Sequence, residues 1–273
     1  MTAPTLLLND GNCIPQIGLG TWPLKDDEAA TTVVAAIAAG YRHIDTAYRY
    51  GNETGVGRGI RASGIRREDI FVTTKLDGEF QGGDRAVDGL HESLRRLGLE
   101  YVDLLLIHWP LPQRDEYIST WKTFEKLVAA GKARSIGVSN FKPAHLERLL
   151  AEATIRPAVN QIQLNPRITR PEHRACHVEQ GIVTVAWGPL APGTDLLADP
   201  TIASIAAKYG KTPGQVVLRW HLELGVVPIP KSANLSRLAQ NIDIFDFALT
   251  GDEVASISAL DTGEGVDSDT MGH

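Results

Sequence analysis

The chain has 273 residues, of which 43% are hydrophobic and 22% are charged, and its formal net charge is -6. This balance is typical of a folded globular protein, and the length suffices for one large domain or two ordinary ones. The acidic charge argues against a general nucleic-acid-binding protein, which would carry a basic surface. We therefore expect no nucleic-acid partner.

The sequence also shows no membrane span, no signal peptide and no cysteine motif, which restricts the class of protein further. No apolar run approaches the length of a membrane span, and residues 1–10 lack the basic segment and long apolar core of a signal peptide. Cys13 and Cys176 form neither a C-x-x-C pair nor a disulfide framework. We expect a cytoplasmic protein without a membrane partner.

One pattern repeats along most of the chain, after a hairpin over residues 6–15 that turns at Asp10-Gly11. Apolar runs predict eight strands at residues 17–20, 42–45, 70–75, 102–108, 134–139, 158–163, 183–187 and 226–231. Amphipathic stretches predict intervening helices that include residues 27–39, 85–97, 117–130 and 143–153. Further helices are predicted at residues 200–209, 213–224, 235–242 and 250–260.

Alternating strands and helices indicate parallel strands joined by helical crossovers. Eight such units predict an α/β fold of the closed (β/α)8 type, a TIM barrel, with an N-terminal β-hairpin and extra C-terminal helices. Because no linker or break in composition interrupts the pattern, we expect a single domain over residues 1–273. The tail at residues 261–273 is rich in Gly and Asp, and we expect it to form a loop that closes over the site.

Ionisable side chains end three successive predicted strands, at Asp45, Lys75 and His108, and Tyr50 follows Asp45 by five residues. In a barrel of this type the chemistry lies at the carboxyl ends of the strands. A buried Lys75 ammonium needs a partner, and Asp45 is the natural one. Taken singly, Asp45 could cap a turn, Lys75 could form a structural ion pair and His108 could be a core histidine. Together they favour an active site.

Nine segments resemble the aldo-keto reductase family, and the resemblance spans nearly the whole chain. They are residues 18–22 (GLGTW), 40–47 (GYRHIDTA), 50–53 (YGNE), Lys75, 107–110 (IHWP), 137–141 (GVSNF), 160–161 (NQ), 188–190 (GPL) and 229–232 (IPKS). The short tail and residues 187–190 are similar to those of bacterial members such as the 2,5-diketo-D-gluconate reductases.

The resemblance implies NAD(P)H-dependent reduction of aldehydes and ketones, with Asp45, Tyr50, Lys75 and His108 as the catalytic tetrad. Tyr50 would be the general acid. A free Tyr titrates near ~10, and we expect the Lys75 ammonium to lower this pKa by stabilising the phenolate. Asp45 would hold Lys75 charged, and His108 would donate to the substrate oxygen.

A cofactor site is implied without a Rossmann fingerprint, because no G-x-G-x-x-G motif is present, and a Tyr-x-x-x-Lys pair is also missing. The resemblance implies an extended dinucleotide across the barrel mouth, with its carboxamide held by Ser139, Asn140 and Gln161 and its nicotinamide ring stacked on Trp187. It also implies cofactor contacts from Gly20, Thr21, Gly188, Pro189, Leu190, Lys231, Ser232, Arg237 and Asn241.

Lys231, Ser232 and Arg237 lie on a loop and helix start, where a phosphate is favoured. They indicate NADP(H) rather than NAD(H), and the alternative is a solvated basic patch. Trp22, Tyr48 and Trp109 adjoin strand ends and are predicted walls for a small-molecule carbonyl substrate. The family often has an aromatic residue after Lys75-Leu76, where this chain has residues 77–80 (DGEF). A monomer is what the family implies.

Two other classes remain open. A metal-dependent barrel hydrolase could use His43, Asp45 and His108, but the chain lacks the clustered ligand set of a closed metal site, so we expect no metal. An NADP(H)-binding sensor could retain the cofactor site without significant turnover.

Overall fold

A computed structural model describes residues 3–273, and the first two residues of the predicted domain and N-terminal segment lie outside it. Within residues 3–273, eight parallel strands form one sheet in which neighbours follow chain order from β3 to β10. The strands are β3 (Leu19–Gly20), β4 (His43–Asp45), β5 (Phe71–Leu76), β6 (Val102–Ile107), β7 (Ala133–Ser139), β8 (Val159–Gln163), β9 (Val183–Trp187) and β10 (Val227–Pro228).

The sheet closes on itself between its first and last strands. The amide of Gly18 donates to Pro228 O at 3.1 Å, and the amide of Gly20 donates to Pro230 O at 3.1 Å. A Cβ at position 20 would lie only 2.8 Å from Ile229 O, so glycine allows the two backbones to meet. The predicted (β/α)8 barrel is confirmed.

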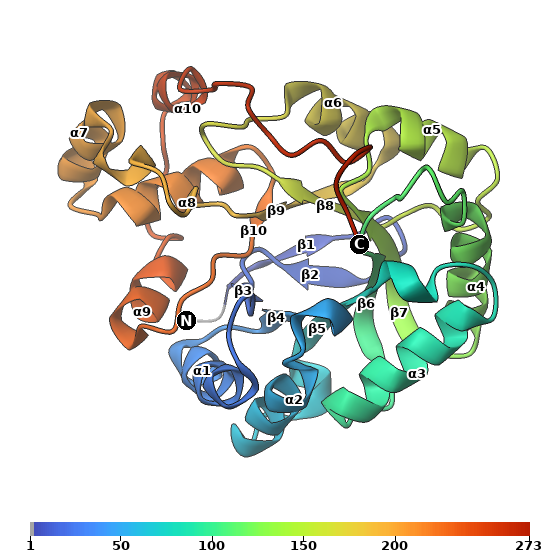
Figure 1. Cartoon of the computed structure of the whole chain (residues 1–273). Helices are drawn as coiled ribbons and strands as arrows, with labels where there is room; N and C mark the ends of the chain where they lie inside the picture. The colour runs from blue at the N-terminus through green and yellow to red at the C-terminus, as the bar shows by residue number, and fades with distance from the viewer. Residues whose placement is uncertain (1–2) are drawn as a thin grey trace.

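Helices surround this barrel on all sides in Figure 1. They are α1 (Asp26–Ala39), α2 (Glu53–Ala62), α3 (Arg85–Leu97), α4 (Tyr117–Ala129), α5 (Pro143–Leu150), α6 (Pro171–Gln180), α7 (Pro200–Tyr209), α8 (Pro213–Glu223), α9 (Leu235–Ile242) and α10 (Gly251–Ser258). The predicted ends agree to within two residues, except that α5 stops at Leu150 and β10 has only two residues; β3 also has only two. The shortness of β10 has a simple cause, since Pro228 and Pro230 have no amide hydrogen for a ladder.

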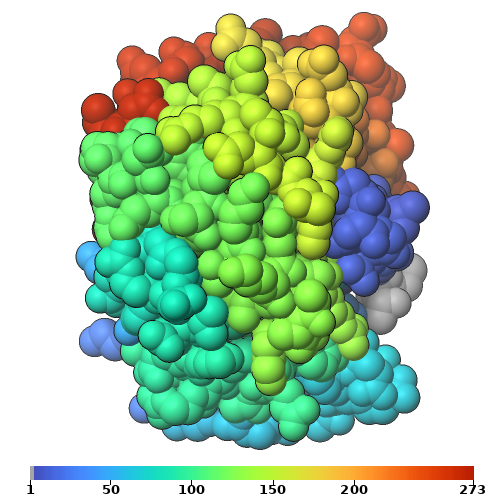
Figure 2. Space-filling view, turned by 90° about the vertical axis from the view of Figure 1, so that its right-hand side faces the viewer, coloured from blue at the N-terminus to red at the C-terminus, as the bar shows by residue number. Residues whose placement is uncertain are grey.

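The hairpin of β1 (Thr5–Leu7) and β2 (Cys13–Pro15) covers the amino-terminal end of the barrel. Its Ile14 is fully buried and belongs to the same apolar cluster as Leu104 and Leu106 on β6. In Figure 2 the hairpin, in blue, lies at the right edge of the molecule, opposite the red atoms at the upper left edge. The hairpin therefore closes one end of the barrel and leaves the other end for the tail.

The C-terminal tail crosses the carboxyl ends of the strands. Figure 1 shows it, in dark red, running from α10 past α6 and α5 to the middle of the barrel. The Val266 amide donates to Gln163 Oε1 at 2.8 Å, Lys142 pairs with Asp269 at 2.5 Å, and the Gly78 amide donates to His273 O at 3.2 Å. Among residues 3–273 no helix has both the length and the apolar character needed to cross a membrane.

Candidate active site

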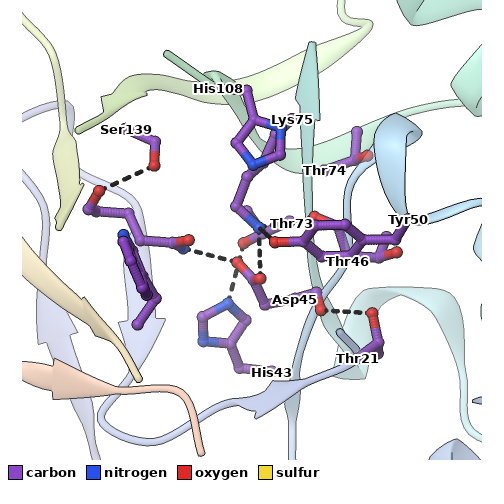
Figure 3. Close-up of polar contacts among 12 residues, drawn as sticks. Thr21, His43, Asp45, Thr46, Tyr50, Thr73, Thr74, Lys75, His108 and Ser139 are labelled. Carbon is purple, nitrogen blue, oxygen red and sulfur yellow. Dashed lines mark hydrogen bonds and ion pairs between the residues drawn. The ribbon is translucent and has the colours of Figure 1, made fainter. Parts of the chain in front are cut away.

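The Lys75 ammonium lies at the centre of the polar groups that end the first strands of the barrel (Figure 3). Its Nζ donates to Asp45 Oδ1 at 2.5 Å, to Thr46 O at 2.9 Å and to Tyr50 Oη at 3.3 Å. Asp45 ends β4, Lys75 lies on β5, and Tyr50 ends a short 3-10 turn after β4. The prediction that Asp45 is the partner of Lys75 is confirmed.

Asp45 is held from a second side as well. Gln161 on β8 donates from Nε2 to Asp45 Oδ2 at 2.7 Å, so both carboxylate oxygens accept a hydrogen bond. A buried ion pair is tolerated when its remaining polar groups are also satisfied. Gln161 therefore fixes the orientation of the carboxylate that in turn fixes Lys75.

His108 follows β6 and faces Tyr50, with the two rings edge-on at a centroid distance of 5.8 Å. Its amide donates to Leu76 O at 3.2 Å, and Asn140 Nδ2 donates to its carbonyl at 3.1 Å. Burial, aided by the charge of Lys75, lowers the pKa of His108 well below its usual value. The imidazole is therefore neutral near pH 7 and carries one N–H that it can donate.

The expected lowering of the Tyr50 pKa is wrong. Burial raises the pKa of Tyr50 above its usual value and outweighs the Lys75 charge, which lowers it, and the Asp45 carboxylate adds a smaller raising effect. Burial also works against the Lys75 charge, but Asp45 and Tyr50 outweigh it and raise the pKa of Lys75. The resting site thus holds a protonated phenol beside a charged ammonium.

A cavity of about 1150 Å³ opens at this end of the barrel, and Asp45, Tyr50 and His108 line it. Lys75 lies behind Asp45 and Tyr50 and is almost completely buried. Ligand pockets commonly measure roughly 300–1,000 Å³, so this volume can take a ligand larger than an ordinary small substrate. Ten of the predicted cofactor residues line the cavity: Gly20, Thr21, Ser139, Asn140, Gln161, Trp187, Gly188, Pro189, Leu190 and Lys231.

Trp187 is anchored by one edge of its indole. Its Nε1 donates to Asn140 Oδ1 at 2.8 Å, and Asn140 itself follows β7 in a left-handed conformation with φ 64°. Ser139 Oγ donates to Gln161 O at 2.9 Å, which fixes the neighbouring hydroxyl. An anchored aromatic ring beside amide and hydroxyl groups fits a planar heteroaromatic amide such as nicotinamide.

Of the other predicted cofactor residues, Ser232 and Arg237 lie at the start of α9, and Asn241 lies near its end. Ser232 Oγ accepts from the Asn234 amide at 3.1 Å, and Asn234 Oδ1 accepts from the Arg237 amide at 3.0 Å, which caps the helix. Arg237 is exposed and Asn241 is buried, and neither is among the lining residues. A ligand that extends past Lys231 would reach this helix start.

Two of the three predicted substrate residues, Trp22 and Trp109, line the cavity. Trp22 is 58% exposed and lies over Tyr50 at a ring-centroid distance of 5.3 Å. Tyr48 points elsewhere: its ring packs edge-on against Phe80 and lies 4.0 Å from the Arg96 guanidinium. Tyr48 and Tyr50 begin and end the same turn of 3-10 helix, and sequence alone does not tell which of the two side chains faces the cavity.

Several lining residues escaped the sequence analysis. They are Arg49, Gln163, Asn165, Arg167, Ile168, Ala191, Pro192, Thr194, Asp195, Thr262, Glu264 and His273, among others. Arg49 could have been found, because it directly precedes Tyr50. The tail as a whole was expected to close over the site, but its sequence does not tell which of its residues, here Thr262, Glu264 and His273, reach the cavity.

Comparison with known proteins gives a consistent picture. Residues 16–262 match the model of the Aldo/keto reductase family. An aldo-keto reductase of Mycolicibacterium smegmatis is 51% identical over 262 residues, which cover 96% of this chain and 95% of that protein. A 2,5-diketo-D-gluconic acid reductase B of Corynebacterium sp. is 47% identical over 270 residues, or 99% and 98% of the two chains. A solved structure of a Bombyx mori aldo-keto reductase in complex with NADP has a TM-score of 0.92 at 42% identity and covers 98% and 96%.

Proposed function

The chain belongs to the aldo/keto reductase family, and from this we propose that it reduces aldehydes or ketones to alcohols with NADPH. The observation that carries the proposal is the group of Asp45, Tyr50, Lys75 and His108 at the cavity end of the barrel. Bound NADPH would supply a hydride for the carbonyl carbon. The residues of the chain must then orient the carbonyl and deliver a proton to its oxygen.

We assign the proton transfer to Tyr50. Because burial raises its pKa, the phenol is protonated at neutral pH and ready to donate. The Lys75 ammonium, 3.3 Å from the phenol oxygen, would stabilise the phenolate that forms as the proton leaves. Its role lies in the transition state rather than in the resting pKa. General acid catalysis of this kind contributes roughly 10²–10⁴-fold.

His108 and Asp45 would support that step. A neutral His108 imidazole can donate a hydrogen bond to the carbonyl oxygen and so hold it beside the Tyr50 hydroxyl. Asp45 keeps Lys75 charged and in position, because an unpaired ammonium at this depth would lose its proton. These two residues act on orientation and charge, and the proton itself comes from Tyr50.

For the cofactor we assign Ser139, Asn140 and Gln161 to the carboxamide and Trp187 to the nicotinamide ring. Gly20, Thr21, Gly188, Pro189 and Leu190 would line its path, and Asn241 would approach the adenine. Lys231, Ser232 and Arg237 would bind the 2′-phosphate, a site favoured by paired cations and the start of α9. This set favours NADPH over NADH.

For the substrate we assign Trp22 and Trp109 as apolar walls that enclose a small carbonyl compound. The Corynebacterium relative is named as a reductase of 2,5-diketo-D-gluconic acid, which is a reason to test keto-sugars alongside aromatic aldehydes and α-diketones. The proposal also takes the enzyme to be a cytoplasmic monomer with one catalytic domain over residues 1–273.

The test is NADPH consumption against such a panel, with Tyr50→Phe and Tyr48→Phe measured beside the unmodified enzyme. Tyr50→Phe should lose about 10²-fold or more of kcat while NADPH still quenches tryptophan fluorescence with nearly unchanged affinity. Tyr48→Phe removes the same group from the same turn but outside the cavity, and should keep most of its turnover. If Tyr50→Phe retained its turnover, Tyr50 would not be the acid. NADPH binding without consumption of any substrate would instead favour the sensor.

A further inference from the structure

Three metal-ligand side chains from distant parts of the chain meet beside the tetrad. They are Asp77 after β5, His108 after β6 and His273 at the end of the described tail. One possible ligand atom from each lies within 4.8 Å of the other two. This group differs from the set of His43, Asp45 and His108 that the sequence suggested, because Asp45 is fully engaged by Lys75 and Gln161.

Asp77 has one oxygen that the fold does not use. Its Oδ1 accepts from the Glu79 amide at 3.2 Å, whereas its buried Oδ2 accepts no hydrogen bond from any group in residues 3–273. The Arg49 Nε atom lies 3.9 Å from Oδ2, which is beyond hydrogen-bonding distance. A buried carboxylate oxygen left without a donor is costly and calls for a partner.

His108 also has a buried polar atom without a hydrogen-bond partner among residues 3–273. Its Nδ1 is buried and forms no hydrogen bond within the described part of the chain. His273 meets it edge-on, with ring centroids 5.3 Å apart, and the Gly78 amide holds the backbone of His273 in place at 3.2 Å. Two residues that each have an unpartnered buried atom thus lie beside an accessible imidazole.

We propose that Asp77, His108 and His273 bind a divalent transition metal of the zinc class, and that this metal inhibits the reductase. Two imidazoles and one carboxylate are a ligand set that zinc uses when a fourth position stays open. Hard cations such as Mg²⁺ and Ca²⁺ prefer all-oxygen sites, so they do not fit this set.

The three ligand atoms would have to move only slightly closer together to bind one ion. Bonds of about 2.0–2.2 Å to a tetrahedral ion place the ligand atoms roughly 3.4 Å apart, and the present separations are all within 4.8 Å. Asp77 and His108 lie in buried segments at the ends of neighbouring strands, whereas His273 is exposed. Rotation of the His273 side chain is therefore the movement that would complete the site.

Inhibition is expected because one of the three proposed ligands, His108, also belongs to the tetrad. A metal held by His108 and His273, which both line the cavity, would fix the His108 ring and occupy space beside it that the carbonyl substrate needs. The metal would also tie the tail to the segment after β5, across one side of the cavity that His108 and His273 line. The inhibitory effect rests on the proposed function, but the metal site itself does not.

The site is tested by metal titration of the full chain without a histidine tag, after dialysis against a chelator and without cofactor or substrate. Co²⁺ should bind at about one equivalent with the visible absorption of low coordination, and Zn²⁺ should displace it, whereas Mg²⁺ should not. Asp77→Asn and His273→Ala should each weaken binding by about 100-fold or more, since even outer-shell partners are worth about 10–100-fold. His91→Ala, which removes an exposed histidine on α3, should bind as tightly as the unmodified chain.

Unchanged affinity in both Asp77→Asn and His273→Ala would overturn the site, as would the absence of saturable binding. In the NADPH assay, Zn²⁺ should inhibit the unmodified enzyme and the His91→Ala variant, and His273→Ala should resist it when compared with its own metal-free rate. Equal inhibition of His273→Ala would overturn the inhibitory role. Should the chain reduce no carbonyl compound, the proposed function fails and the titration still decides the site.

Discussion

Lys75 Nζ lies 2.5 Å from Asp45 Oδ1, and the two side chains are only 1% and 2% exposed. A pair this deep loses the hydration of both ions, so its stability depends on complete satisfaction of every polar atom. Thr46 O, Tyr50 Oη and Gln161 Nε2 supply the remaining hydrogen bonds. The pair is therefore part of the fold as well as of the proposed chemistry.

Breaking this pair from one side should be costly to the fold. Asp45→Asn leaves a buried ammonium without a counter-charge, and we expect the free energy of unfolding to fall by about 3–5 kcal/mol. The double variant Asp45→Asn with Lys75→Met removes both charges and should recover a large part of that loss. Urea unfolding followed by tryptophan fluorescence measures both. The single variant Lys75→Met completes the cycle. If the double variant lost as much free energy of unfolding as Asp45→Asn and Lys75→Met lose in sum, the two ions would not stabilise each other.

The raised pKa of Tyr50 predicts how carbonyl reduction depends on pH. The acid must be protonated to act, and burial keeps the phenol protonated beyond its usual pKa of about 10. The value of kcat/KM for reduction should therefore stay level from about pH 7 to pH 9.5 and decline only above that range. A decline with a midpoint near pH 7 or 8 would show that Lys75 outweighs burial after all. Rates with the best substrate of the panel, measured at saturating NADPH, decide between the two.

Recognition of the 2′-phosphate can be tested at Arg237, which is exposed beside the capped start of α9. Arg237→Gln should raise the dissociation constant for NADPH by about 10-fold or more, since a charge-assisted hydrogen bond is worth about 1.5–3 kcal/mol. The constant for NADH should change little. Lys126→Gln on α4 removes the same unit of charge at another exposed position and serves as the control. Equal changes for both cofactors would show that Arg237 does not bind the 2′-phosphate.

The barrel could be predicted because its strands are buried on both faces and therefore appear as short apolar runs, such as residues 104–107 (LLLI). The ionisable residues at the ends of these runs stand out for the same reason. Asp45, Lys75 and His108 interrupt apolar sequence at the points where a barrel places its chemistry. The pairing of Asp45 with Lys75 then follows from the cost of burying either charge alone.

Other features depend on burial and on contacts between distant segments, and only the folded structure determines these. The pKa of Tyr50 depends on whether burial or the Lys75 charge has the larger effect, and burial is a property of the finished fold. The orientation of Tyr48 depends on contacts with Phe80 and Arg96 from other segments. The approach of His273 to His108 depends on the whole path of the tail.

Close packing of α2 gives a further prediction about the fold. This helix begins directly after the turn that carries Tyr50, and it packs against α1 and α3 through two glycines. A Cβ at Gly55 would lie 1.8 Å from Asp26 O, and one at Gly57 would lie 1.9 Å from Leu97 O. Neither position has room for a methyl group, because the opposing atoms belong to the backbone of neighbouring helices.

We therefore expect Gly55→Ala to lower the free energy of unfolding by about 1–3 kcal/mol, the usual range for overpacking. Alanine improves helix propensity by about 1 kcal/mol, but a clash with backbone exceeds that gain. Gly251→Ala in α10 makes the same exchange where a Cβ would meet nothing within 4 Å, so it should leave stability unchanged or slightly higher. Urea unfolding of both variants gives the comparison. If Gly55→Ala were as stable as Gly251→Ala, the separation between α1 and α2 would have to be adjustable, and the position of Tyr50 would not depend on their close contact.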